Sequence, residues 1–189
     1  LVIVINKVDL EDPSIITKKF APYVKMGYPV LQTSAKDARG VDAVRELVKG
    51  KIAAFTGQSG VGKTSLLNCL QPGLGRAVRN VSNYHQEGVH TTRDSALIKL
   101  DPTIYGDKTY LADTPGMRSL NIWDVEPDEL DGYFRDLSSH IGDCRFSNCT
   151  HAHEPGCGVR SALKKNLISF VRYKSYLKLR EELEAMYAY

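Results

Sequence analysis

The stretch Gly57-Gln-Ser-Gly-Val-Gly-Lys63-Thr64 decides the fold of this chain. It fits the pattern G-x-x-x-x-G-K-[ST] at every fixed position, between an expected strand at residues 51–56 and an expected helix at residues 63–70. The glycines let successive N–H groups point at phosphate oxygens, and the helix N-terminus adds partial positive charge. A glycine-rich turn without a ligand is the weaker alternative. The residues expected to bind a nucleoside triphosphate are Gly57, Gln58, Ser59, Gly60, Val61, Gly62, Lys63, Thr64 and Ser65.

Two further loops identify the base. Asn6-Lys7-Val8-Asp9 follows the apolar run at residues 1–5, and Thr33-Ser34-Ala35-Lys36 follows a second expected strand at residues 29–33. The Asp9 carboxylate can accept two hydrogen bonds from guanine N1–H and N2–H₂, a donor pair that adenine lacks. As a lone tetrapeptide the first loop could be a polar turn, but the second supplies a backbone N–H for guanine O6. Together they predict a guanine site formed by Asn6, Lys7, Asp9, Ser34, Ala35 and Lys36.

The remaining nucleotide contacts are expected around Mg²⁺ and the γ-phosphate. Lys63 can reach the β- and γ-phosphates, and the Thr64 hydroxyl can bind Mg²⁺. Asp113-Thr-Pro-Gly116 follows a strand expected at residues 108–112, so Asp113 can hold Mg²⁺ through water and the Gly116 N–H can meet the γ-phosphate. Either Thr91 or Thr92, at the end of a long loop, can close over Mg²⁺.

The coarse pattern predicts an α/β fold with a mainly parallel sheet. Expected strands at residues 1–5, 29–33, 51–56, 95–100 and 108–112 alternate with expected helices at residues 14–26, 41–49 and 63–70. The first strand is expected to be buried on both faces, the first helix to be interrupted near Pro22, and the last two strands to be joined by a turn. Residues 1–123 form the expected GTPase domain, and residues 124–189 a helix-rich domain with helices at 126–138 and from 159 onward.

Composition narrows the class of protein. The 189 residues are 42% hydrophobic and 25% charged, which excludes a disordered chain or a coiled-coil rod. The longest apolar run, residues 1–5, is far short of the ~20 residues that span a bilayer, and no signal peptide opens the chain. We expect no membrane partner and a monomer. The net charge of +3 neither requires nor excludes a nucleic-acid partner.

A second site is expected in the C-terminal part. Cys144, Cys149, His151 and Cys157 supply three thiolates and one imidazole, the complete tetrahedral shell of one structural Zn²⁺. His153 is the alternative histidine ligand. Incidental Cys and His residues in a loop are the weaker interpretation, and disulfides are disfavoured by the interleaved histidines and the lack of an export signal.

Charge is unevenly distributed in the same part of the chain. Between residues 160 and 180 seven basic residues occur without an acid, with Phe170, Tyr173 and Tyr176 among them. This helix could be a solvated face with an apolar stripe, or it could contact RNA phosphates. Residues 124–136 contain six acids and one Arg, and we expect that stretch to face away from RNA.

These loops resemble the motifs of translation-factor-like GTPases in a circularly permuted order, with the base loop before the phosphate loop. With the zinc segment, the chain resembles the small ribosomal subunit biogenesis GTPases of the RsgA/YjeQ type over nearly all its length. The resemblance includes the runs at residues 88–92 and 123–137. It implies hydrolysis of GTP to GDP and phosphate with Mg²⁺, one Zn²⁺, late maturation of the small (30S) ribosomal subunit, contact with its rRNA, and a cytoplasmic location. It also favours Thr92 over Thr91, because the T-R-D run recurs in related GTPases.

The catalytic group is less clearly indicated. Many GTPases orient the attacking water with a glutamine after D-x-x-G, but Met117 occupies that position here, as an apolar residue does in the resembled family. The resemblance implies His90 as the substitute, beside Lys63 and Thr92, although a packing role for His90 is equally expected. The alternative functions are a permuted GTPase serving another RNA particle, such as the large subunit, and an RNA-binding zinc module with a vestigial nucleotide site.

The resemblance also implies segments that the sequence does not contain. A complete GTPase domain of this type has six strands, and its members carry an OB-fold before it. Five strands are expected here. The missing strand and helix would precede the base loop, with that strand between the phosphate-loop strand and residues 1–5. Since the first residue is Leu1, we expect that the chain begins inside the GTPase domain of a longer protein.

Overall fold

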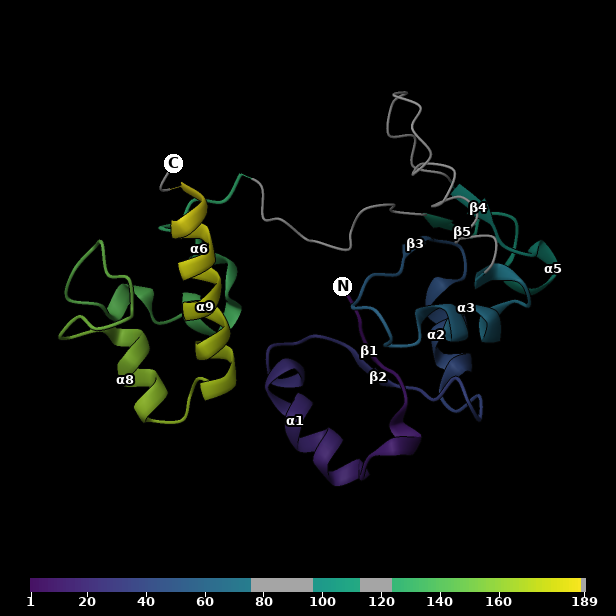
Figure 1. Ribbon diagram of the computed structural model, residues 1–189, viewed down its shortest axis with the longest axis horizontal. Coiled ribbons are helices and arrows are strands. Elements are labelled where there is room, and N and C mark those ends of the chain that lie inside the picture. The colour runs from purple at the N-terminus through teal and green to yellow at the C-terminus, as the bar shows by residue number, and fades with distance from the viewer. Residues whose placement is uncertain (76–96, 113–123, 188–189) are drawn as a thin grey trace. The chain divides into compact units, whose positions relative to one another are not determined.

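The computed structural model describes residues 1–75, 97–112 and 124–187, which divide into two compact units at residues 1–120 and 121–189 (Figure 1). No helix in the described ranges is long and apolar enough to cross a membrane. The first unit is of the α/β type, and the second is built from helices and loops.

The strands of the first unit form two sheet pieces. β1 (Ile3–Ile5) pairs in parallel with β2 (Val30–Gln32). The other piece has the order β3-β5-β4, in which β3 (Ile52–Ala54) is parallel to β5 (Tyr110–Ala112) and β4 (Leu97–Lys99) is antiparallel to it. The mainly parallel prediction is confirmed in two of the three pairings. Within the described residues β1 and β3 are not paired, and β1 is half-buried, so the prediction of burial on both faces is wrong.

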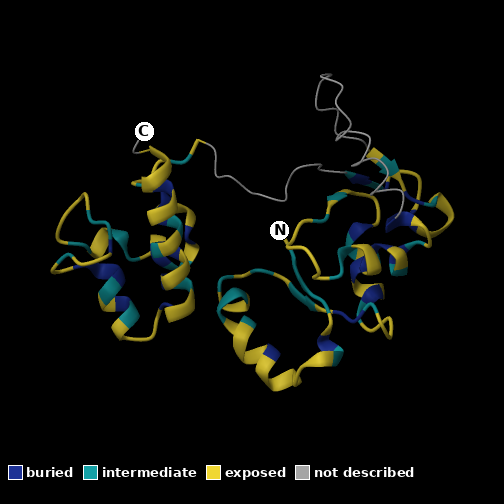
Figure 2. Ribbon diagram, viewed as in Figure 1, coloured by how far each residue is buried: buried dark blue, intermediate teal, exposed yellow. Residues whose placement is uncertain are grey.

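Two helices supply most of the core of the first unit. α2 (Val41–Val48) and α3 (Lys63–Leu70) pack against each other and against the β3-β5-β4 piece. Figure 2 shows the buried residues gathered on these helices, whereas α1 (Pro13–Lys25) is mostly exposed. The core is formed by Val41, Val44, Val48, Leu66, Leu67, Leu70, Leu74, Leu100, Tyr105 and Leu111.

Two local predictions in this unit are wrong. α1 continues past Pro22: this proline lacks the N–H that would bond to the Lys18 carbonyl, but its own carbonyl still accepts the Met26 N–H at 3.1 Å. The connection between β4 and β5 begins with a short helix, α5 (Pro102–Tyr105), where a turn is expected, and only its end, at residues 107–108, is a turn. Asp101 caps α5 by accepting the Thr103 N–H at 2.8 Å, and the hydrogen bonds from Thr103 lower the pKa of this carboxyl.

Within residues 124–187, the second unit contains five short or medium helical segments. These are α6 (Leu130–Tyr133), α7 (Arg135–Ser138), the 3₁₀ helix η2 (Ile141–Asp143), α8 (Gly158–Lys164) and α9 (Phe170–Tyr187). The single helix expected at residues 126–138 is broken at Phe134, which is extended (φ −92°, ψ 96°) and packs edge-on against Tyr176. Burial of this ring in the core outweighs helix continuity. The helix expected from residue 159 onward is split into α8 and α9.

Candidate functional sites

The phosphate loop lies where the sequence predicts it, between the end of β3 and the start of α3. Gly57, Gly60 and Gly62 have φ of 152°, 80° and 93°, values that glycine adopts without steric cost. The Lys63 ammonium lies inside the curl and donates to the carbonyls of Gly57 and, at 2.8 Å, Gln58. The loop is exposed apart from half-buried Gly62 and Lys63, so its binding groups are accessible to a ligand from solvent.

Asn6 joins the phosphate loop to both loops of the predicted guanine site. Its Nδ2 donates to the carbonyl of Val61 at 3.0 Å, and its Oδ1 accepts the Ala35 N–H at 3.1 Å. A Cβ at Gly62 would lie 2.3 Å from this Nδ2, so only glycine leaves room for the bridge. Three loops that are far apart in the sequence therefore meet at one amide side chain, and Asn6 positions loops in addition to belonging to the base motif.

The other guanine-site residues lie around this bridge. Lys7 has a left-handed backbone (φ 67°), and its Nζ donates to the Gly60 carbonyl at 2.6 Å. Asp9 lies in the adjacent 3₁₀ helix η1 (Val8–Leu10), which is tied to the second loop by a Val8 N–H···O=C Thr33 bond of 3.2 Å. Ser34 is fully buried and Lys36 is exposed. The structure thus brings together the phosphate loop and both base loops.

Several predicted nucleotide contacts are not placed. His90, Thr91, Thr92, Asp113, Gly116 and Met117 lie outside the described residues, so their roles remain predictions. Of the expected Mg²⁺ ligands only Thr64 is described, on the first turn of α3, where it is exposed beside the equally exposed Ser65.

The predicted zinc ligands converge in the second unit. The ligand atoms of Cys144, Cys149, His151 and Cys157 all lie within 4.8 Å of one another. Cys144 Sγ and Cys157 Sγ are 3.9 Å apart, close to the ~3.8 Å edge of a tetrahedron with ~2.3 Å Zn–S bonds. His153, the alternative ligand, is exposed and not part of this group. The donor set and its spacing fit one structural Zn²⁺.

The histidine of this cluster is held on both sides. His151 is fully buried, and its Nδ1 lies 3.5 Å from Cys144 Sγ and 3.4 Å from Cys157 Sγ. Its Nε2 lies 2.9 Å from Asp131 Oδ2. The backbone of His151 is left-handed (φ 63°), a conformation that costs of order 1 kcal/mol or more outside glycine. Its carbonyl accepts the Tyr173 hydroxyl at 2.6 Å, which fixes that backbone.

The loop that carries these ligands is closed by a half-buried carboxylate. Glu154 Oε1 accepts the Thr150 N–H at 2.6 Å, and its Oε2 accepts the His153 N–H at 3.1 Å. Burial raises the pKa of Glu154, but hydrogen bonds from Thr150 and from nearby backbone N–H groups outweigh it and bring the pKa to about 2. The Thr150 carbonyl in turn accepts the Tyr176 hydroxyl at 3.0 Å.

Burial disfavours the ionised form of two cysteines of the cluster. Burial raises the pKa of Cys149 to about 12 and also raises the pKa of Cys157. A bound Zn²⁺ would offset this cost of ionising the thiols, because metal-bound cysteine is a thiolate.

Two of the seven basic residues are committed to internal ion pairs. Arg172 forms a two-pronged contact with Asp136 at 3.0 and 3.2 Å, and its guanidinium lies over the Phe134 ring. Arg180 is buried and pairs with Asp128 at 2.7 Å. The expectation that the whole basic helix is a solvated or RNA-contacting face is therefore wrong for these two, and part of the acidic stretch serves as their counter-ions.

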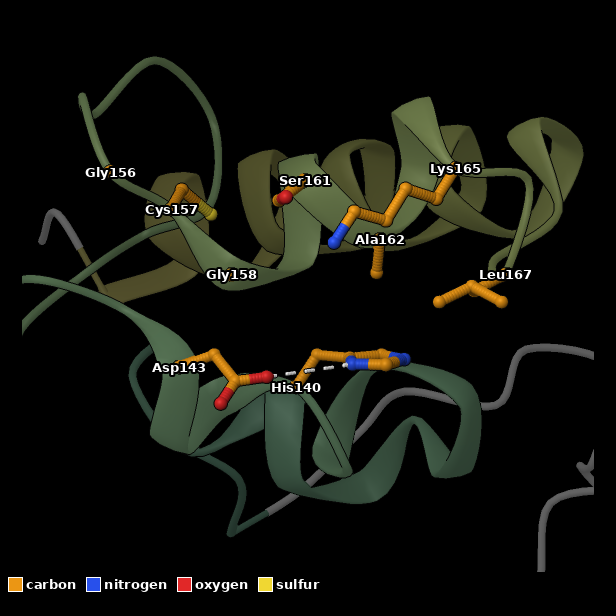
Figure 3. A pocket seen from close by; sticks show the side chains of 9 residues that line it. All are labelled: His140, Asp143, Gly156, Cys157, Gly158, Ser161, Ala162, Lys165 and Leu167. Carbon is orange, nitrogen blue, oxygen red and sulfur yellow. Dashed lines mark ion pairs between the residues drawn. The ribbon is translucent and has the colours of Figure 1, made fainter.

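A hollow of about 410 Å³ adjoins the zinc cluster (Figure 3). It lies between η2 and α8, with the Lys165 side chain on one side and the His140 ring on the other. His140 Nδ1 is 3.9 Å from Asp143 Oδ2. Cys157 lines the same hollow, which places this depression directly beside one of the predicted zinc ligands.

Comparison with known proteins agrees with this arrangement. A family model described as RsgA GTPase matches residues 1–123. The small ribosomal subunit biogenesis GTPase RsgA 2 of Bacteroides thetaiotaomicron is 44% identical over 162 residues, which cover 86% of this chain and 51% of that protein. The RsgA of Thermotoga maritima is 43% identical over 184 residues, which cover 96% of this chain and 60% of that protein.

Solved structures show the same fold. YjeQ from Thermotoga maritima superposes with a TM-score of 0.74 at 39% identity, covering 96% of this chain and 59% of that one. YloQ, described as a circularly permuted GTPase, gives a TM-score of 0.71 at 28% identity, covering 98% of this chain and 57% of that one.

The loop order and these structural likenesses define the class as a circularly permuted GTPase fold. The chain belongs to the RsgA GTPase family. It spans about 51–60% of the length of the curated relatives to which it is similar.

Proposed function

We propose that this chain binds GTP with Mg²⁺ and hydrolyses it to GDP and phosphate, as part of a late maturation factor of the small (30S) ribosomal subunit. The observation that carries the proposal is the Asn6 bridge, since it brings a phosphate loop and two base loops to one place. The similar proteins named small ribosomal subunit biogenesis GTPases support the biological context.

The described residues suit distinct parts of the reaction. The N–H groups at residues 57–64 bind the phosphate oxygens, and Lys63 exchanges its loop carbonyls for the β- and γ-phosphates as charge develops there. Thr64 on α3 is a ligand for Mg²⁺, which when bound neutralises part of the phosphate charge. Asp9 and the Ala35 N–H select guanine.

The undescribed residues complete the proposal. Thr92, with Thr91 as the alternative, and Asp113 join Thr64 at Mg²⁺, and the Gly116 N–H meets the γ-phosphate. Because Met117 cannot polarise water, His90 holds the attacking water in line with the γ-phosphate.

We place the rRNA contact at a patch formed by Lys164, Lys165, Leu167, Phe170, Val171 and Lys174, called the basic–aromatic patch below. The three lysines are exposed, and so are Leu167, Phe170 and Val171. Lys174 Nζ lies 5.4 Å from the Phe170 ring centre, which keeps an aromatic face next to positive charge. Lysines that contact phosphates and an exposed ring on which a base stacks are the features of RNA-binding surfaces. The hollow beside Lys165 adjoins this patch.

The same context supports two coarser proposals. Assembly of ribosomal subunits takes place where ribosomes are made, so we propose a cytoplasmic location. We also propose that the chain acts as a monomer on the subunit, without a membrane partner.

A GTP hydrolysis assay with and without purified ribosomal subunits tests the function. We expect slow turnover by the chain alone and acceleration by small subunits, with Lys63→Ala inactive and Lys18→Ala, on exposed α1, unchanged. Acceleration by large subunits alone favours service on another particle. RNA binding without any GTP binding favours a vestigial nucleotide site, and either result contradicts the proposal.

His90 has a separate test. If it positions the water, His90→Ala lowers subunit-stimulated turnover by about 10²-fold or more, a typical loss for a positioned catalytic group, while GDP affinity is kept. Unchanged stimulated turnover contradicts this role.

The basic–aromatic patch is tested by RNA binding at several salt concentrations. Replacing Lys164, Lys165 and Lys174 by Gln removes three expected phosphate contacts, so the slope of log affinity against log salt should fall by about two to three. Lys18, Lys19 and Lys25 replaced by Gln form a control with the same charge change. An unchanged slope in the patch variant contradicts the assignment.

A further inference from the structure

Asp131 makes a contact that the four-ligand zinc pattern does not contain. Its Oδ2 lies 2.9 Å from His151 Nε2, and its side chain is only 16% exposed. The opposite ring nitrogen, Nδ1, faces the sulfurs of Cys144 and Cys157. The imidazole is thus placed between a carboxylate and the metal-binding atoms.

The chemistry of imidazole gives this contact a consequence. A neutral histidine carries one ring proton, and the nitrogen that binds a metal must be the other one. An ionised carboxylate accepts hydrogen bonds and donates none, so Asp131 requires the proton on Nε2. That choice leaves the Nδ1 lone pair free and aimed at the cysteine sulfurs.

Asp131 is itself held by the surrounding helices. It lies on α6, whose Leu130 is buried, and flanking acids Asp128 and Asp136 pair with Arg180 and Arg172 of α9. The same helix α9 holds the backbone of the ligand loop through the hydroxyls of Tyr173 and Tyr176. One helix therefore fixes both the carboxylate and the histidine that it orients.

We propose that Asp131 is the positioning residue of the zinc site: it fixes the Nε2–H tautomer of His151 and presents Nδ1 to the metal. This proposal rests on zinc binding by the four ligands. It assigns a function to Asp131, which belongs to the acidic stretch at residues 124–136 and precedes the four predicted zinc ligands in the sequence.

Zinc affinity of the whole chain, measured by competition with a chromophoric chelator, tests the proposal. Asp131→Leu, of similar size without an acceptor, should bind Zn²⁺ about 10–100-fold more weakly. Asp131→Asn keeps an acceptor oxygen and should restore most of the affinity, while remaining several-fold weaker than the unchanged chain. The matched control is Glu129→Gln, an exposed acid two residues away that does not contact a ligand.

The outcomes distinguish failure of zinc binding by the four ligands from failure of the positioning role of Asp131. If the unchanged chain binds no stoichiometric Zn²⁺, the zinc site itself is wrong. If it binds one Zn²⁺ and both Asp131 variants bind within twofold of it, the positioning role is overturned. Should Asp131→Leu fail to fold, Asp131→Asn alone decides by the same twofold limit.

A spectroscopic readout distinguishes positioning from simple packing. In the zinc-bound chain with ¹⁵N-labelled histidine, we expect the His151 ring to carry its proton on Nε2 and to bind the metal through Nδ1. Metal binding through Nε2 would overturn the proposal, whatever the affinities show.

Discussion

The nucleotide loops of residues 1–120 and the zinc loop of residues 121–189 differ in where their binding atoms come from. The phosphate loop is exposed backbone, and its one charged side chain, Lys63, rests on carbonyls of its own loop. The predicted zinc ligands are side chains held by further partners, such as Asp131, which contacts His151.

The difference shows how each site obtains its specificity. A backbone cradle needs only glycine conformations and one bridging amide, so its residues lie in short contiguous motifs. A side-chain cluster needs buried groups from several helices to hold each ligand, so much of its apparatus lies outside the motif. Ligand removal should therefore have very different effects on the two units.

The largest expected effect follows removal of zinc. Structural Zn²⁺ contributes about 10–16 kcal/mol to the folding of small zinc domains, so a chelator or Cys149→Ala should unfold residues 121–189. Near-ultraviolet circular dichroism reports the packing of aromatic side chains, and GDP titration reports the first unit. We expect loss of the part of the tyrosine signal that comes from the buried Tyr173 and Tyr176, with GDP binding retained, and Cys69→Ser as the control should keep both. A second unit that keeps its packing without zinc would show that the metal does not stabilise residues 121–189.

The next effect concerns the phosphate loop. Lys63→Ala removes a cation that makes charge-assisted hydrogen bonds worth ~1.5–3 kcal/mol to phosphate, so GTP affinity should fall by at least about tenfold. Zinc content should stay at one per chain, which metal analysis of the same sample checks. The opposite pattern, with zinc lost and GTP binding intact, would contradict the division between the sites.

Base selection should respond to a single atom. Asp9→Asn replaces a carboxylate oxygen by an amide N–H, which repels the guanine donors and suits the added carbonyl of xanthine. A paired contact to a base edge is worth ~1–3 kcal/mol, so GDP affinity should fall and xanthosine diphosphate affinity rise by about 10–100-fold. Competition binding with both nucleotides measures this preference, and unchanged guanine selectivity would show that the loop has another role.

The smallest expected effect comes from an ion pair within the second unit. Asp136→Ala leaves Arg172 without its carboxylate partner in a mostly buried place, so the unfolding free energy of this unit should fall by about 1–3 kcal/mol. Glu182→Ala breaks an exposed pair with Lys178 and should cost at most about 0.5 kcal/mol. Equal effects in thermal unfolding would show that the Arg172 pair contributes no more than a surface contact.

Sequence alone could predict the sites that are local. The phosphate loop occupies eight consecutive residues, and the four zinc ligands fall between residues 144 and 157, so each could be read without knowing how the chain folds. The base loops could be assigned because each follows a strand, and parallel strands bring their carboxyl ends to the same edge.

Contacts that depend on packing were not predictable in this way. Asp131 reaches His151 across 20 residues, and the only signal was an excess of acids that also fits a solvated stretch. The helix break at Phe134 was also not predictable, because it depends on packing of this ring against Tyr176, which is distant in the sequence. Pro22 is the opposite case, because α1 accommodates this proline although it lacks the N–H that would bond to the carbonyl of Lys18.

We propose that this chain carries a guanine nucleotide site within residues 1–120 and a zinc site within residues 121–189. Hydrogen exchange followed by mass spectrometry, with and without GDP·Mg²⁺ and with and without a zinc chelator, tests it most directly. We predict that GDP·Mg²⁺ slows exchange at residues 57–64 and around Asn6 and Ala35, whereas the chelator speeds exchange only within residues 121–189. Absence of protection by GDP·Mg²⁺ would contradict the guanine nucleotide site. Faster exchange of the phosphate loop on zinc removal would contradict the independence of the two sites.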